Sequence, residues 1–112
     1  MTGLTVLIKA MPSVDHNRKT ERVMIHEEVS MRSPVSCVGR TVDIGAGGIG
    51  LEIPLEVPVG SVLEMTIFEG HLVVQGQARW VRPVEKGFRV GVQFVEEDWS
   101  IIERVQKMRQ NA

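Results

Sequence analysis

The sequence predicts an all-β domain, a small antiparallel barrel followed by one C-terminal helix, on three observations. Apolar residues alternate with polar ones at strand period, as in Leu63, Met65 and Ile67. Glycine and proline interrupt this pattern at short intervals, as turns between antiparallel strands do. The last residues instead repeat apolar positions at helical spacing. Short strands of this kind fit a barrel or a sandwich, and a barrel has the advantage of leaving no exposed strand edge.

The candidate strands follow one another through the middle of the chain. They cover residues 23–31, 35–43, 49–53, 62–68, 72–83 and 88–95. Upstream, the alternation of Leu4, Val6 and Ile8 predicts a further short strand, and the polar run 12–21 predicts a loop or mobile arm. The chain is therefore expected to consist of an N-terminal segment with an arm (1–22), a barrel (23–95) and a helical region (96–112), all within one domain.

The C-terminal region has the features of a short amphipathic helix. Asp98 is a suitable N-cap, and Trp99 is expected to join the apolar stripe. The other stripe residues are Ile101, Ile102, Val105 and Met108. Because so short a helix is marginal alone, it should pack against the open end of the barrel.

Composition limits the function before any motif is considered. The chain has 112 residues, with 43% hydrophobic and 24% charged, which is typical of one globular domain. A net charge of −1 argues against a protein held on a nucleic-acid polymer by bulk charge. Neither a signal peptide nor an apolar run long enough to span a bilayer is visible, so no membrane insertion is expected. A single cysteine, Cys37, fits a reducing, cytoplasmic setting.

Nothing in the sequence indicates catalysis, a metal site or a cofactor. The histidines His16, His26 and His71 are scattered and lie in no zinc-binding motif. Cys37 falls in a predicted strand, where it is expected to be a small buried hydrophobe. The serines lie in no nucleophile-elbow motif. The protein is therefore predicted not to be an enzyme.

Two short motifs are informative. Arg18 and Arg22 stand four residues apart just before the first core strand, and their guanidinium groups offer forks of N–H donors suited to phosphate or to guanine. Asp43 precedes a glycine-rich turn, Gly45–Gly48, where the backbone can approach a ligand closely. Together these groups can bind a guanine nucleotide. On the residues alone, an ordinary charged arm and a tight strand connection are the preferred explanation, because such short motifs often match by chance.

Two neighbouring residues of the candidate strand 72–83 have simple structural explanations. Trp80 is expected to be a half-buried strand aromatic rather than a stacking platform. Arg79 should point to the opposite face of the strand, because side chains alternate. A ligand contact by Arg79 is the less favoured alternative.

The order of these motifs resembles the PilZ domain family, whose pattern is RxxxR followed by [D/N]xSxxG. Arg18 and Arg22 match the first motif, and Asp43, Gly45 and Gly48 fall on the second. Further similarity lies in Gly48-Ile49-Gly50-Leu51, the Pro58-Val59-Gly60 break, Val74-Gln75-Gly76-Gln77-Ala78-Arg79-Trp80 and Gly91-Val92-Gln93-Phe94. The resemblance covers most of the chain, from Arg18 to Phe94.

The resemblance implies a fold and a function. The fold is a six-stranded antiparallel β-barrel of the split-barrel type with a C-terminal helix. The function is that of a receptor for the bacterial second messenger cyclic di-GMP, regulating a partner protein in processes such as motility and biofilm formation. Arg18 and Arg22 would then take the phosphates and guanine edges, Asp43 would bind guanine, and Gly48 would keep the turn open.

The chain departs from the family pattern at one site position. Gly45 occupies the serine slot and lacks its hydroxyl, a loss of about 1 kcal/mol unless water replaces the group. Asn17 also stands where many relatives carry a basic residue. The alternative function is therefore a PilZ-like adaptor that binds no nucleotide and acts through protein–protein contacts in pilus or motility systems. A single-stranded nucleic-acid barrel ranks lower, because interleaved aromatic residues and positive charge are missing.

Overall fold

The computed structural model describes residues 21–111 of the chain. Within them, seven strands and one helix follow in order: β1 (Arg22–Met24), β2 (Glu28–Ser33), β3 (Cys37–Gly45), β4 (Gly48–Ile53), β5 (Val62–Ile67), β6 (Leu72–Val84), β7 (Gly87–Phe94) and α2 (Ile101–Asn111). The predicted strand around Leu4–Ile8 and the arm that carries Arg18 lie outside the described residues.

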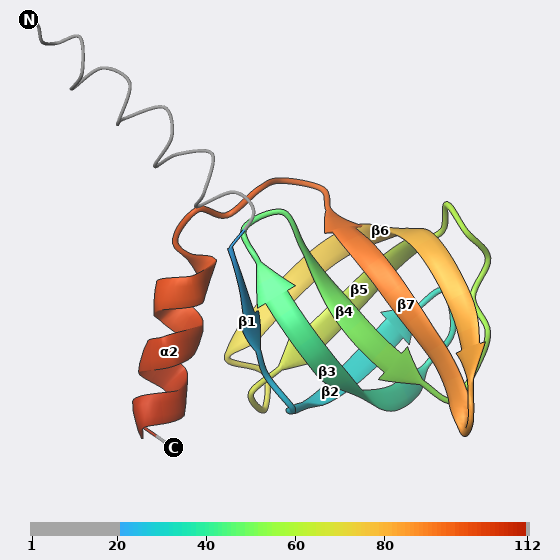
Figure 1. Cartoon of the computed structure of the whole chain (residues 1–112), viewed down its shortest axis with the longest axis horizontal. Helices are drawn as coiled ribbons and strands as arrows, with labels where there is room; N and C mark the ends of the chain where they lie inside the picture. Colours follow the sequence, from blue (N-terminus) through green and yellow to red (C-terminus); the bar gives the residue numbers. More distant parts are fainter. Residues whose placement is uncertain (1–20, 112) are drawn as a thin grey trace, which may run out of the picture.

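Six of the strands close into an antiparallel barrel, which confirms the predicted fold (Figure 1). The strands run β3-β2-β5-β6-β7-β4 around the sheet, and pairing between β3 and β4 closes the ring. Side chains alternate between the inside and the outside, so that Leu63, Met65 and Ile67 of β5 are all fully buried. Closure pairs every barrel strand on both sides and buries one continuous apolar core.

The prediction of one continuous strand over residues 23–31 is wrong, because this segment forms parts of two strands, β1 and β2. Both pair with β3: β1 lies along residues 43–45 and β2 along residues 37–40. Between them, the buried Thr41 hydroxyl accepts a hydrogen bond from the Glu27 N–H (2.8 Å) and donates one to the Ile25 carbonyl (3.0 Å). Thr41 thus satisfies the backbone where the chain steps from one pairing to the next, a tertiary arrangement that no glycine or proline signals in the sequence.

The helix begins at Ile101, later than the start of the predicted region. Asp98 acts as the predicted cap, since its carboxylate accepts the Ser100 N–H at 3.0 Å. Ile101 and Val105 are buried in the barrel core. The expectation for Trp99 is wrong, because Trp99 precedes the helix and 46% of it remains exposed.

Helix α2 stands beside β1 at one end of the barrel (Figure 1). The Arg109 guanidinium donates to the Met24 carbonyl of β1 at 3.2 Å, which ties the last turn of the helix to this strand. No helix among residues 21–111 combines the length and the apolar character that crossing a membrane requires.

Candidate functional site

A bidentate ion pair between Arg22 and Asp43 joins β1 to β3 on the outer face of the barrel. Arg22 donates from Nε to Asp43 Oδ2 (3.2 Å) and from Nη2 to Asp43 Oδ1 (2.9 Å). The register places Met24 opposite Asp43 and Arg22 opposite Gly45, so the two side chains meet on a diagonal. Both are partly exposed, and solvent screening keeps such a pair below about 1 kcal/mol. The pair therefore orients two polar groups more than it stabilises the fold.

Glycines beside this ion pair allow close approach of neighbouring groups. A Cβ on Gly48 would lie 2.2 Å from the Val92 carbonyl oxygen of β7, so β4 needs glycine there to pack against β7. A Cβ on Gly50 would lie 2.6 Å from Asp43 Oδ1, because the carboxylate rests on this glycine. The sequence predicted Gly48 as the residue that keeps a turn open, and the structure adds the contact that requires it.

Trp80 lies over a glycine of the adjacent strand. A Cβ on Gly91 would be only 2.2 Å from Trp80 Nε1, so the indole covers the position where that side chain would stand. The ring is 44% exposed and the Arg82 guanidinium carbon lies 5.2 Å from its centroid. Trp80 is therefore half-exposed, as expected, but it presents its ring system on the same outer face as Asp43.

Arg79 corrects the expectation of strict alternation. The pairing between β6 and β7 shifts register between Ala78 and Trp80, which is a β-bulge. An inserted residue lets two successive side chains reach the same side of a sheet. Arg79 and Trp80 consequently line one hollow together.

This hollow, which we call the arginine hollow, has a volume of about 470 Å³. It crosses the outer face of β3, β4, β7 and β6, between the Arg22–Asp43 pair and Trp80. Its lining residues are Arg22, Val42, Asp43, Gly47, Gly48, Ile49, Gly50, Arg79, Trp80, Arg82, Arg89, Gly91, Val92 and Gln93. Four guanidinium groups and the Asp43 carboxylate line the hollow, and a second carboxylate, Glu52, pairs with Arg89 (2.6 Å). A local excess of two positive charges thus stands on a chain whose net charge is −1.

Comparison with known proteins identifies the family. The family model described as PilZ domain matches residues 16–107. The chain belongs to the PilZ domain family. PilZ domains are receptor or adaptor domains rather than enzymes.

A solved structure supports the fold independently. The inhibitor of motility MotI/DgrA from Bacillus subtilis superposes with a TM-score of 0.60 at 15% identity, over 80% of this PilZ domain and 48% of that protein. The chain thus spans about half the length of that relative. A comparison with curated proteins gives no match.

Within this PilZ domain, the structure brings only part of the sequence-predicted site together. Arg22, Asp43 and Gly48 line the arginine hollow. Gly45 lies beneath Arg22, with its Cβ position 3.3 Å from Arg22 Cγ. Arg18 lies outside the described residues.

The sequence did not reveal most of the residues that line the arginine hollow on β6 and β7, around Trp80. No motif points to Arg82 or Arg89, Gly91 enters only through the family resemblance, and a ligand contact is not the preferred expectation for Arg79 or Trp80. Strand pairing places them near Asp43, which period-two patterning within one strand cannot reveal.

Gly45 has a structural reason to depart from the family's serine. A Cβ at this position would lie 2.6 Å from the Glu21 carbonyl oxygen. Since that oxygen belongs to the backbone just before β1, a serine side chain requires the start of β1 to move. The glycine therefore allows β1 to pair closely with β3 at the point where Arg22 reaches Asp43.

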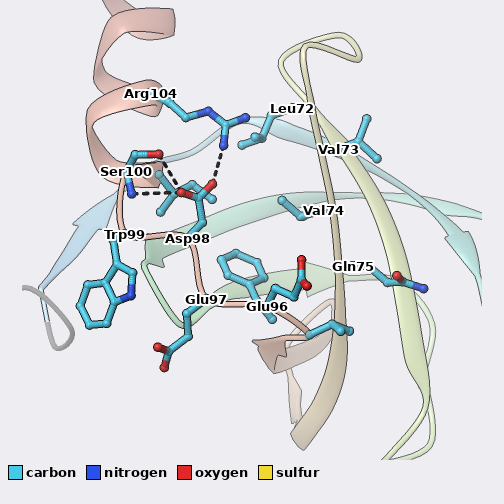
Figure 2. A pocket seen from close by; sticks show the side chains of 13 residues that line it. Leu72, Val73, Val74, Gln75, Glu96, Glu97, Asp98, Trp99, Ser100 and Arg104 are labelled. Carbon is cyan, nitrogen blue, oxygen red and sulfur yellow. Dashed lines mark hydrogen bonds and ion pairs between the residues drawn. The ribbon is translucent and has the colours of Figure 1, made fainter.

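A second hollow, the Trp99 hollow, lies where the chain passes from β7 to α2 (Figure 2). Its volume is about 530 Å³, and its lining combines the exposed apolar residues Val73, Val95 and Trp99 with Glu96 and Asp98. Other lining residues are Leu72, Val74, Gln75, Phe94, Glu97, Ser100, Ile101 and Arg104. Three carboxylates and one guanidinium stand in this lining, so the Trp99 hollow is acidic where the arginine hollow is basic.

Asp98 organises one wall of the Trp99 hollow. Figure 2 shows its carboxylate joined to Ser100 and to the Arg104 guanidinium. Burial by itself would raise the pKa of Asp98, but the hydrogen bonds from Ser100 and the positive charge of Arg104 outweigh it, so the pKa lies below its usual value. Asp98 therefore stays ionised well into the acidic range.

Cys37 and the acidic or histidine side chains add no further site. Cys37 is half-buried at the start of β3, and burial raises the pKa of its thiol, which disfavours a nucleophilic thiolate. Within residues 21–111, no three histidine, cysteine, aspartate or glutamate side chains gather as metal ligands would.

Proposed function

We propose that this PilZ domain is a non-catalytic cytoplasmic receptor for cyclic di-GMP. The observation that carries the proposal is the arginine hollow, in which the Arg22–Asp43 pair and the Trp80 ring face each other across Gly50 and Gly91. Cyclic di-GMP combines two phosphates with two guanine bases. A surface that combines spare guanidinium groups, one carboxylate and an aromatic face complements all of these groups.

Each residue has a distinct role in this proposal. Arg22 donates to a phosphate oxygen or to the acceptor edge of guanine, and Asp43 accepts from the donor edge of guanine. Because Asp43 already holds the Arg22 guanidinium at 2.9 Å, both groups are oriented before the ligand arrives. Trp80 stacks on a base through the part of its ring that the Arg82 guanidinium leaves exposed. Gly45 lets β1 pair closely with β3 at Arg22, and Gly48 maintains the packing of β4 on β7 beneath the ligand.

Arg18 supplies the second fork and the means of signalling. It precedes Arg22 by four residues and is proposed to bind the dianionic ligand together with it. Contact of Arg18 with the ligand would then change the surface offered to a partner protein.

Calorimetric titration of the full chain with cyclic di-GMP tests the proposal. Loss of a charge-assisted pair that contributes roughly 1.5–3 kcal/mol should make Arg22→Ala bind at least tenfold more weakly. Arg32→Ala is the matched control, because Arg32 is an exposed arginine of β2 outside the arginine hollow. Equal affinities for wild type and Arg22→Ala contradict the assigned site, and no binding by the wild type contradicts the receptor function.

The adaptor remains the second candidate, favoured by two observations. Gly45 lacks the serine hydroxyl, and the Trp99 hollow exposes apolar side chains of the kind that protein partners cover. An amide NMR titration with cyclic di-GMP separates the two functions. Shifts at Arg22 and residues 45–48 support the receptor, whereas an unchanged spectrum at high ligand concentration supports the adaptor.

A further inference from the structure

Two arginines stand directly opposite each other at the Trp80 end of the arginine hollow. Arg82 of β6 pairs in register with Arg89 of β7. Like charges in this position destabilise a sheet, so the arrangement calls for a compensating anion. Arg89 has one, since it donates from Nε (3.1 Å) and Nη2 (2.6 Å) to Glu52 Oε2. Arg82 forms no ion pair with any other residue in the range 21–111.

The surrounding strands do not supply the missing charge. The residues paired in register across the strands run Arg82, Arg89, Glu52, Arg40 and Glu28. The carboxylate of this row closest to Arg82 is Glu52, and Arg89 already binds it. Asp43, the carboxylate that lines the hollow, already accepts a hydrogen bond from Arg22 at each of its two oxygens. The Arg82 end of the hollow therefore keeps an uncompensated positive charge.

Trp80 orients the guanidinium of Arg82 without using its donors. The guanidinium carbon lies 5.2 Å from the ring centroid, a cation–π contact that engages the face of the group. A guanidinium carries its five N–H donors in the plane, along its edge. Those donors stay available to an oxygen-bearing anion, and the planar fork fits phosphate better than a lysine ammonium does.

We propose that Arg82 and Arg89 form an anion subsite that binds phosphate oxygens. The inference rests on the proposed function: the occupant is the phosphate of cyclic di-GMP that lies farther from Arg22. Strands β1 and β6 are four strand spacings apart around the barrel, about 19 Å along the sheet. Arg22 and Arg82 thus approach the ligand from opposite ends of the arginine hollow.

Binding and stability measurements on Arg82→Gln test the subsite. We expect cyclic di-GMP to bind about tenfold or more weakly, with the unfolding midpoint of the free domain nearly unchanged. Arg82→Lys keeps the charge but loses the fork, and it should recover only part of the affinity. Arg32→Gln on β2 removes the same charge outside the hollow and should bind as the wild type does.

The outcomes separate the subsite from the proposed function. If Arg82→Gln binds like the wild type while Arg22→Ala loses binding, the subsite is wrong and the receptor function stands. If the wild type does not bind cyclic di-GMP, inorganic pyrophosphate becomes the probe in thermal unfolding. A pyrophosphate-dependent rise of the wild-type midpoint that Arg82→Gln loses and Arg32→Gln keeps supports the subsite. No rise in the wild type, or an equal rise in all three proteins, overturns it.

Discussion

The arginine hollow lies on hydrogen-bonded strands, whereas the Trp99 hollow lies where the chain leaves the sheet for the helix. Each contains an exposed tryptophan, but their surroundings differ. Trp80 rests on Gly91 with guanidinium groups around it, while Trp99 stands beside Glu96 and Asp98. A rigid floor with excess positive charge suits a small dianion, and a surface with excess negative charge does not. The charge of the lining and the support of hydrogen-bonded strands, rather than the volume of the hollow, therefore distinguish the proposed ligand site.

The largest effect should follow from filling the floor of the arginine hollow. Gly48→Ala would place a Cβ 2.2 Å from the Val92 carbonyl oxygen, a backbone atom that moves only with β7. We expect the free energy of unfolding to fall by about 2–3 kcal/mol, measured by urea denaturation. Gly47→Ala is the matched control in the same turn, because its nearest outside atom is 4.0 Å away. Equal stability of the two variants would show that β4 does not need glycine at 48.

The tryptophans provide the sharpest test of the comparison. Trp80→Ala removes the proposed stacking face and should weaken cyclic di-GMP binding by roughly 1–3 kcal/mol, or about fivefold to 150-fold. Trp99→Ala changes an equally exposed ring in the other hollow and should leave the affinity unchanged. Calorimetric titration measures both. If Trp99→Ala loses more affinity than Trp80→Ala does, the ligand binds in the Trp99 hollow and the proposed site is wrong.

Restoring the family's serine should have a smaller and less obvious effect. Gly45→Ser adds a hydroxyl suited to a ligand, but its Cβ would lie 2.6 Å from the Glu21 carbonyl oxygen. We expect the free energy of unfolding to fall by about 1 kcal/mol and the melting midpoint to drop with it. Cyclic di-GMP should not bind more tightly. Calorimetry and thermal unfolding on the same samples check this. Tighter binding at unchanged stability would mean that the start of β1 accommodates a side chain at position 45. The missing hydroxyl would then be the only effect of glycine there on the affinity for cyclic di-GMP.

The smallest effect concerns the wall of the Trp99 hollow. The pKa of Asp98 is lower in the folded state than its unfolded value of about 3.9. Its carboxylate therefore contributes stability that is fully present above that value and is lost as the pH falls through the folded pKa. The stability difference between wild type and Asp98→Asn should narrow from pH 6 to pH 3. A difference that does not change with pH would mean that only the hydrogen bonds matter.

The sequence by itself determined the type of fold and one half of the candidate site. Period-two alternation with glycine and proline turns predicts strands because it reports burial on one face, a local property of each segment. Arg22, Asp43 and Gly48 were predicted because they lie in short linear motifs that resemble those of the family, and the structure brings them together in the arginine hollow. Asp98 was found as a cap because capping depends on residues two or three positions apart.

Tertiary structure alone decided the other half. The step from β1 to β2 depends on Thr41, which bonds residues more than ten positions away. The bulge after Ala78 turns Arg79 to the side of Trp80, and strand register sets Arg82 opposite Arg89. Register and bulges arise from pairing between distant segments, and a one-residue change in either moves a side chain to the opposite face. The positive charge of the arginine hollow is thus a product of strand pairing rather than of any single stretch of sequence.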